Sequence, residues 1–316
     1  MQTSPAHDRA RPDARRSAPL KLLLLVALAL PLCGCARPFD AGGGANSAAG
    51  ANAAPTAAAP AAAPAPDVTK APDKGDFRVA RHAQAPGEDA ETRAEVEDEE
   101  KSLEEAAAEL NKAFSLPHDI FIGFDRCDEP NAFYDPEKKQ VTVCYELVED
   151  LYEAFKGDFK TDEELDDVVG NATTFVFFHE VGHALVDAYD LPITGREEDA
   201  VDQLSVLVLA DGTEEGDQTV LDAARSFAGE TQEELDELAF ADEHSFDRQR
   251  FYNIICLLYG QNGEKFASLV KEGMLPEGRA ERCADEYARA DKAWDALLAP
   301  YVKVSLDART PAPPPR

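Results

Sequence analysis

One apolar segment constrains this chain more than any other. Residues 173–189 are apolar enough to form a buried helix, and a run of three phenylalanines and a valine leads into the motif His179-Glu180-Val181-Gly182-His183. A spacing of four places both imidazoles on one helix face, about one turn apart. This spacing suits two ligands of one Zn²⁺ ion, with Glu180 beside them to act on a metal-bound water. Two satisfied core histidines are the alternative interpretation.

A third metal ligand is expected on the next helix. A stretch that contains Pro and Gly ends the first helix, so a second helix should begin near residue 196. Glu198 and Asp202 lie four residues apart there and face the same way. We assign Glu198 as the third zinc ligand and Asp202 as the acceptor that orients a ligating imidazole. Glu197 and Asp199 are rivals, and an acidic helix start favoured by the helix dipole would also explain them.

This ligand set predicts a reaction. A catalytic zinc keeps one position for water, polarises a carbonyl and lowers the pKa of that water to near 7. Glu180 would take the water proton as general base and pass it to the leaving amine. The pattern therefore predicts zinc-dependent hydrolysis of a peptide bond, with a peptide or protein as substrate.

Composition divides the chain into four parts. Residues 41–66 contain only Ala, Gly, Pro, Asn, Ser and Thr, so they have no large apolar side chain to bury. We expect one folded domain, of class α+β and mostly helical, entered through an acidic helix over residues 91–114. A small sheet should pack on the helix that carries the two histidines. The predicted parts are a signal peptide (1–34), a linker (35–90), the folded domain (91–305) and a Pro-rich tail (306–316).

The N-terminus predicts export. A basic start is followed by the apolar run Leu22 to Leu32, which is too short to span a bilayer and suits the central region of a secretory signal. The ending Leu32-Cys33-Gly34-Cys35 resembles a bacterial lipobox, which makes Cys35 the lipid anchor. The residue after it, Ala36, is not the Asp that typically holds such lipoproteins at the inner membrane. We therefore expect the protein at the periplasmic face of the outer membrane. An ordinary signal peptide cleaved nearby is the alternative.

The charge excludes one class of partner. The 316 residues carry 62 Asp and Glu against 31 Lys and Arg, a formal charge of −31. Removing residues 1–34 leaves 26 bases against 60 acids, a charge of −34. Phosphate contacts need clustered Lys and Arg, so we expect no nucleic acid as partner.

Four cysteines lie beyond the predicted signal. An even number in an exported chain indicates two disulfides, and four cysteines allow three pairings. We favour Cys127–Cys144 and Cys256–Cys283, which are the two pairs local in sequence. A cysteine-based metal site lacks the close spacing that such sites use.

Four blocks of the sequence are similar, in order and spacing, to the neprilysin family of gluzincin-type zinc metallopeptidases. They are Asn131-Ala132-Phe133-Tyr134, the His179–His183 motif, Glu198 to Asp202, and Asp242-Glu243-His244 followed by Arg250. The resemblance implies a zincin-like fold. Residues 115–303 also resemble a family of uncharacterised bacterial metallopeptidase-like proteins. Two features depart from neprilysin itself: the gap from His183 to Glu198 is shorter, and the large helical domain that roofs the neprilysin cavity is absent.

The resemblance implies further roles. Asn131 and Ala132 would lie on an edge strand that binds the substrate backbone, between short strands expected at 120–124 and 140–145. His244 would stabilise the tetrahedral oxyanion with Asp242 as its hydrogen-bond partner, and Arg250 would bind a substrate carbonyl. Turn chemistry is the alternative for Asn131, and a solvated helix face is the alternative for Asp242 and Arg250.

Two readings other than an enzyme stay open. One is a non-catalytic zinc-binding or protein-binding envelope lipoprotein that keeps the scaffold. The other is a structural envelope protein that uses its acidic surface with Ca²⁺, although no D-x-D-x-D-G loop supports it.

Overall fold

The computed structural model describes residues 70–81, 90–228 and 243–303. The predicted signal peptide, the anchor Cys35, most of the linker, the tail and Asp242 lie outside the described residues. The domain boundaries proposed from composition are therefore not decided by the fold.

A small mixed sheet forms one side of the domain. Its strands are β1 (Phe77–Val79), β2 (Ile120–Asp125), β3 (Ala132–Asp135) and β4 (Gln140–Cys144), in the order β1-β2-β4-β3. The first three strands of that order run parallel, and β3 pairs antiparallel with β4. The helix α1 (Ala90–Ala113) makes the crossover from β1 to β2. The strand β3, which carries Ala132, therefore lies at an edge of the described sheet.

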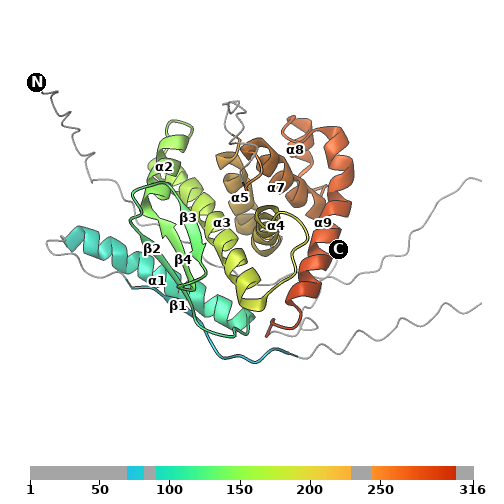
Figure 1. The fold of residues 1–316 in the computed structure, drawn as a ribbon. Helices are drawn as coiled ribbons and strands as arrows, with labels where there is room; N and C mark the ends of the chain where they lie inside the picture. The colour runs from blue at the N-terminus through green and yellow to red at the C-terminus, as the bar shows by residue number, and fades with distance from the viewer. Residues whose placement is uncertain (1–69, 82–89, 229–242, 304–316) are drawn as a thin grey trace, which may run out of the picture.

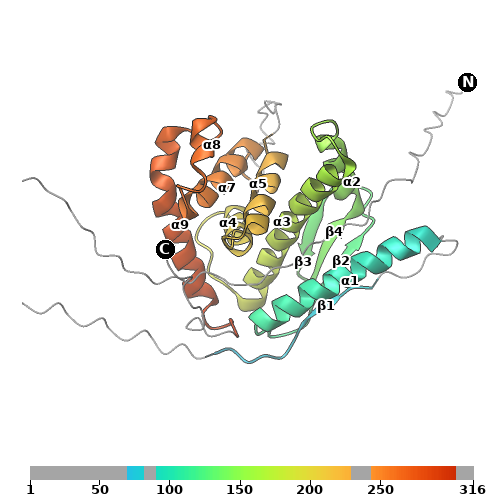
Figure 2. The ribbon, with the colours of Figure 1, turned by 180° about the vertical axis from the view of Figure 1, so that it is seen from behind.

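Helices form the rest of the domain. Figures 1 and 2 show α3 running between the sheet with α1 on one side and a group of helices on the other. α3 contacts β3, β4, α2, α4 and α5. The helices that follow the sheet are α2 (Tyr145–Phe155), α3 (Asp162–Tyr189), α4 (Glu197–Leu209), α5 (Glu214–Ser226), α7 (Asp247–Gln261), α8 (Ala267–Lys271) and α9 (Glu277–Leu298).

The central helix α3 has clear local signals at both ends. Thr161 caps its N-terminus: the Thr161 hydroxyl accepts from Glu164 N at 3.1 Å, and the Glu164 carboxylate accepts from Thr161 N at 3.3 Å. This reciprocal pair satisfies two N–H groups that the first turn leaves without partners. Asp190 ends the helix in a left-handed conformation. Between these ends α3 is buried along most of its length, with Phe175, Phe177 and Leu185 in the main hydrophobic core.

Two disulfides close the fold. Cys127 pairs with Cys144, which joins the loop before β3 to the end of β4, and Cys256 pairs with Cys283, which joins α7 to α9. Both predicted pairings are confirmed. None of the helices in the described part of the chain is both long enough and apolar enough to cross a bilayer.

The expected fold class is confirmed: the domain is α+β, mostly helical, with a small sheet packed on the helix of the two histidines. The expected acidic helix forms α1, and the second helix of the site begins at Glu197, one residue after the expected start.

Candidate metal centre

A glycine sets how closely the two helices of the site pack. A Cβ built on Gly182 of α3 would lie 2.9 Å from both Cβ and Cγ1 of Val201 on α4. Side chains rarely approach that closely, so the absence of a side chain at residue 182 lets the first turns of α4 lie directly against the histidine face of α3. This contact places Glu198 opposite His179 and His183.

Three acceptor atoms converge between the helices. Glu198 Oε2 lies 3.0 Å from His179 Nε2 and 3.3 Å from His183 Nε2, and the two Nε2 atoms are 3.3 Å apart. Zinc–nitrogen bonds of about 2.0–2.1 Å in a tetrahedron place neighbouring ligand atoms roughly 3.3 Å apart. The spacing of these three atoms therefore fits one face of a tetrahedral site.

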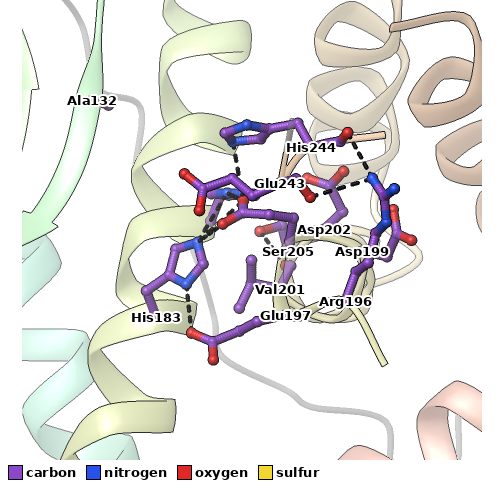
Figure 3. Close-up of polar contacts among 12 residues, drawn as sticks. Ala132, His183, Arg196, Glu197, Asp199, Val201, Asp202, Ser205, Glu243 and His244 are labelled. Carbon is purple, nitrogen blue, oxygen red and sulfur yellow. Dashed lines mark hydrogen bonds and ion pairs between the residues drawn. The ribbon is translucent and has the colours of Figure 1, made fainter. Parts of the chain in front are cut away.

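Carboxylates behind each imidazole fix the direction of its lone pair. His179 Nδ1 lies 2.8 Å from Asp202 Oδ1. His183 Nδ1 lies 2.8 Å from Glu197 Oε1 (Figure 3). A neutral imidazole that donates from Nδ1 presents a lone pair at Nε2. Both lone pairs then point at the centre beside the Glu198 carboxylate. This donor set, two imidazole nitrogens and one carboxylate oxygen, fits a metal ion such as zinc.

The charges in the centre are strongly coupled. Burial alone would raise the pKa of Glu198, but hydrogen bonds from His179, His183 and His244 hold it far below its usual range. Burial lowers the pKa of His183, and its hydrogen bonds with Glu198 and Glu197 more than offset this and raise it to about 9. Without a metal ion, His183 therefore holds a proton, and the positive charge of the imidazolium partly replaces the charge of the metal ion.

Glu180 lies in the same buried region. Its side chain is 7% exposed, and burial raises its pKa above the ordinary value for Glu. A carboxylate whose pKa is raised toward neutrality is a better base for a water proton than an ordinary surface glutamate.

His244 approaches the centre from a segment that is tied to α4. Its Nε2 atom lies 3.1 Å from Glu198 Oε2. Arg196 Nη1 donates to His244 O at 2.7 Å (Figure 3). Ser245 Oγ donates to Asp199 Oδ1 at 2.7 Å. His244 is thus fixed to the residues that flank Glu198, and His179, Glu198 and His244 each offer a ligand atom within 4.8 Å of the others.

Arg250 lies behind the centre. Its Nε and Nη2 atoms donate to the two oxygens of Asp202 at 2.9 and 2.8 Å, and its guanidinium lies 4.2 Å from the centre of the Phe227 ring. Hydrogen bonds from His179 and Arg250 outweigh burial and lower the pKa of Asp202, so Asp202 is a carboxylate. Arg250 thus positions Asp202, whose carboxylate contacts His179 Nδ1.

The edge strand lies on the opposite side of α3 from α4 (Figure 3). Asn131 O accepts from Cys144 N at 2.9 Å, and the Asn131 side chain accepts from Ala132 N at 2.9 Å. Antiparallel pairing directs alternate residues toward the partner strand. The backbone groups of Ala132 and Tyr134 consequently face the open edge of the described sheet.

The sequence predicted most of these residues but did not predict several of their contacts. The structure brings together His179, His183, Glu198, Asp202, His244 and Arg250, with Glu180 beside them. Asn131 and Ala132 lie apart, on β3, and Asp242 lies outside the described residues. Glu197 and Asp199, expected only as rivals of Glu198, contact His183 and Ser245. Nothing in the spacing of Arg196 and Ser245 pointed to their role, because their partners are about 46 to 48 residues away.

Comparison with known proteins gives one match. A family model described as "Putative metallopeptidase" matches residues 83–298, which include every residue of the centre. No curated protein and no solved structure matches the chain. Because the match covers more than half of the sequence, this protein belongs to that metallopeptidase family.

Proposed function

We propose that this protein hydrolyses peptide bonds with a zinc ion held by His179, His183 and Glu198, in the manner of a gluzincin. The observation that carries the proposal is the convergence of these three ligand atoms beside the buried Glu180. The family match supports a peptide or protein as substrate.

The residues of the chain take defined parts in the reaction. Bound zinc would supply Lewis acidity, polarising the scissile carbonyl and making water acidic. Glu180 takes a proton from the attacking water and passes it to the leaving amine. Asp202 and Glu197 keep the two imidazoles oriented. His244, held by Arg196 and by Ser245, donates to the negative charge that develops on the carbonyl oxygen.

The substrate is proposed to bind as an added strand. The Ala132 carbonyl and the backbone groups of Tyr134 can pair with an extended peptide, and the Asn131 side chain, which accepts from Ala132 N, lies at the start of that edge. The contact of Arg250 with Asp202 uses Nε and Nη2, so the Nη1 donors are left over for a substrate carbonyl. We assign Arg250 first to positioning Asp202, which is the contact that the structure shows.

The location of the protein is also a proposal. The basic start, short apolar run and lipobox-like ending support export and a lipid anchor at Cys35, with the domain on a spacer at the periplasmic face of the outer membrane. The two disulfides agree with an oxidising compartment.

The test measures metal content and cleavage on the same preparations. We expect about one zinc per chain by mass spectrometry, retained in Glu180→Gln and lost in His183→Ala and Glu198→Ala. The wild type should cleave members of a peptide library, and Glu180→Gln should be slower by about 10²–10⁴-fold. A wild type that binds no zinc after reconstitution would refute the proposal.

A second candidate function is a non-catalytic zinc-binding envelope protein. The position of His244, 3.1 Å from Glu198 Oε2, favours it, because a fourth protein ligand would close the site to water. In that case zinc would be bound, no peptide would be cut, and His244→Ala would weaken zinc binding. If His244 instead acts on the substrate, that variant would keep its zinc and lose activity.

A further inference from the structure

Asp187 joins the metal helix to the edge strand. It lies on α3 four residues after His183, and its Oδ2 atom accepts from Tyr134 Oη at 2.7 Å and from Lys139 Nζ at 2.8 Å. Tyr134 lies in β3, and Lys139 ends the turn that leads from β3 to β4. One carboxylate on α3 therefore holds the edge hairpin at two points.

Asp187 and Tyr134 have the protonation states that this contact needs. Hydrogen bonds from Lys139 and Tyr134 outweigh burial and lower the pKa of Asp187, so it stays ionised. Burial, with the bond to Asp187, raises the pKa of Tyr134, so its hydroxyl keeps the proton that it donates. The contact is partly exposed, since the side chains of Asp187 and Lys139 are each about one-third exposed, 37% and 35%.

Side-chain packing also joins β3 to α3. The strand has four residues, and its side chains of Ala132 and Tyr134 face α3 because they share a face with the buried Val141 and Val143. Ala132 offers one methyl group for packing. Tyr134 reaches Asp187, so its hydroxyl contributes the directional part of the contact.

We propose that Asp187 is a positioning residue: through Tyr134 and Lys139 it fixes β3 relative to the helix of the metal ligands. This inference rests on the proposed function, in which a peptide docks along β3 and is cut at the centre formed by His183. One turn of α3, about 5.4 Å, separates Asp187 from that histidine. A shift of the strand along α3 would therefore move the docked peptide bond away from Glu180 while leaving the metal ligands in place.

The experiment uses the full chain loaded with zinc and compares Tyr134→Phe, Asp187→Ala and Lys139→Met with wild type. Lys138→Met is the matched control, because Lys138 lies in the same turn and its ion pair, with Asp135 at the end of β3 at 3.0 Å, stays within the hairpin and does not reach α3. We expect zinc content to be unchanged in all four. In the first three variants kcat should fall about tenfold or more, with a smaller change in KM, because misplacement by 1 Å can cost up to about 10²-fold. The double variant Tyr134→Phe/Asp187→Ala should be no slower than Asp187→Ala alone.

Hydrogen–deuterium exchange tests the same contact without any reaction. Backbone amides of residues 132–135 should exchange faster in Asp187→Ala than in wild type or Lys138→Met, with residues 175–183 unchanged. Unchanged exchange in β3, or a kcat within twofold of wild type in Asp187→Ala, would overturn the inference. A zinc-loaded wild type that cuts no peptide would refute the proposed function, and the exchange result would still decide whether Asp187 fixes the strand.

Discussion

Helix α3 carries two partly buried polar clusters, and they differ in how their hydrogen-bond donors and acceptors are matched. The first surrounds Asn171: Asp222 accepts from Asn171 Nδ2 at 2.8 Å, Gln218 Nε2 at 2.8 Å and Arg225 Nη1 at 2.6 Å. The Thr219 hydroxyl, which lies 3.0 Å from Glu215 O, is also a donor for the side-chain oxygen of Asn171 at 3.1 Å. Every bond in this cluster joins a donor to an acceptor, so it is complete in itself.

The second cluster lies about two turns later along α3. Its acceptor atoms are all satisfied only when a cation or a proton is bound between them. His179 Nε2 and His183 Nε2 are both acceptors once the outer nitrogens donate to Asp202 and Glu197, and they face Glu198 Oε2, which has His244 Nε2 as a donor at 3.1 Å. Buried acceptors with no donor are costly, and a cation or a proton removes that cost. The two clusters show that burial and polarity alone do not mark a metal site, whereas an imbalance of donors and acceptors does.

The largest expected effect is that zinc increases the free energy of unfolding through the second cluster and not through the first. Free zinc at 100 times its Kd should raise the free energy of unfolding of the wild type by about 2.7 kcal/mol. His183→Ala should abolish this increase. Asn171→Ala should lower stability by about 1–3 kcal/mol with and without zinc, because it leaves Asp222 short of a donor, and should keep the increase. Denaturant unfolding with and without zinc measures both. An equal zinc increment in His183→Ala would contradict the comparison.

The next effect concerns the carboxylates behind the imidazoles. Asp202→Asn should weaken zinc binding about 10–100-fold, since it removes the acceptor that orients His179. Glu197→Gln should have a smaller effect, because the Glu197 side chain is 44% exposed against 8% for Asp202. Competition with a chromophoric chelator gives both affinities. If the two variants lose zinc affinity equally, the burial of the carboxylate does not determine how strongly it orients its imidazole.

The third effect is a pH dependence of about tenfold in zinc affinity per pH unit. The pKa of His183 in the metal-free chain is raised to about 9, so zinc must displace its proton below that pH. Affinity should increase from neutral pH and level off near pH 9. The stability of the metal-free chain should have the opposite slope: the raised pKa contributes stability that is complete below the unfolded value near 6.5 and is lost as pH rises through 9. A plateau in affinity already at pH 6.5 would show that the imidazole is not held protonated.

The smallest effect comes from the contact of α3 with α4. Gly182→Ala should cost about 1 kcal/mol of stability and reduce zinc affinity, because the new methyl would meet Val201 and push Glu198 away. Gly195→Ala is the control, since a Cβ there meets nothing within 4 Å. Thermal unfolding and zinc titration of both variants check this. Equal behaviour of the two variants would mean that the helices adjust freely.

Local patterns in the sequence predicted much of this molecule. The spacing of His179 and His183, the register of Glu198 with Asp202 and the local cysteine pairs all depend on residues close in the chain. The helix α4 begins almost where the turn residues indicated, and the acidic segment forms α1 as expected.

Contacts between distant segments could not be predicted in the same way. Arg196 reaches the backbone of His244, and Asp187 reaches Tyr134 across 53 residues. The sequence around Asp187 is equally consistent with a solvated helix face, because only the fold brings β3 beside it. The resemblance assigned Arg250 to a substrate carbonyl, and its bidentate contact with Asp202 depends on the packing of α7 against α4.

The bond between Cys127 and Cys144 encloses the whole of β3 in a covalent loop. The other bond, Cys256–Cys283, joins α7 to α9. Neither of the two loops that the disulfides close contains a residue of the metal centre. Reduction of the first would lengthen the free chain on both sides of the edge strand without touching a ligand. Under the proposed function, reduction of this bond would weaken peptide binding at β3 before it weakened metal binding, so a reducing environment would leave a protein that keeps its ion but binds peptides poorly.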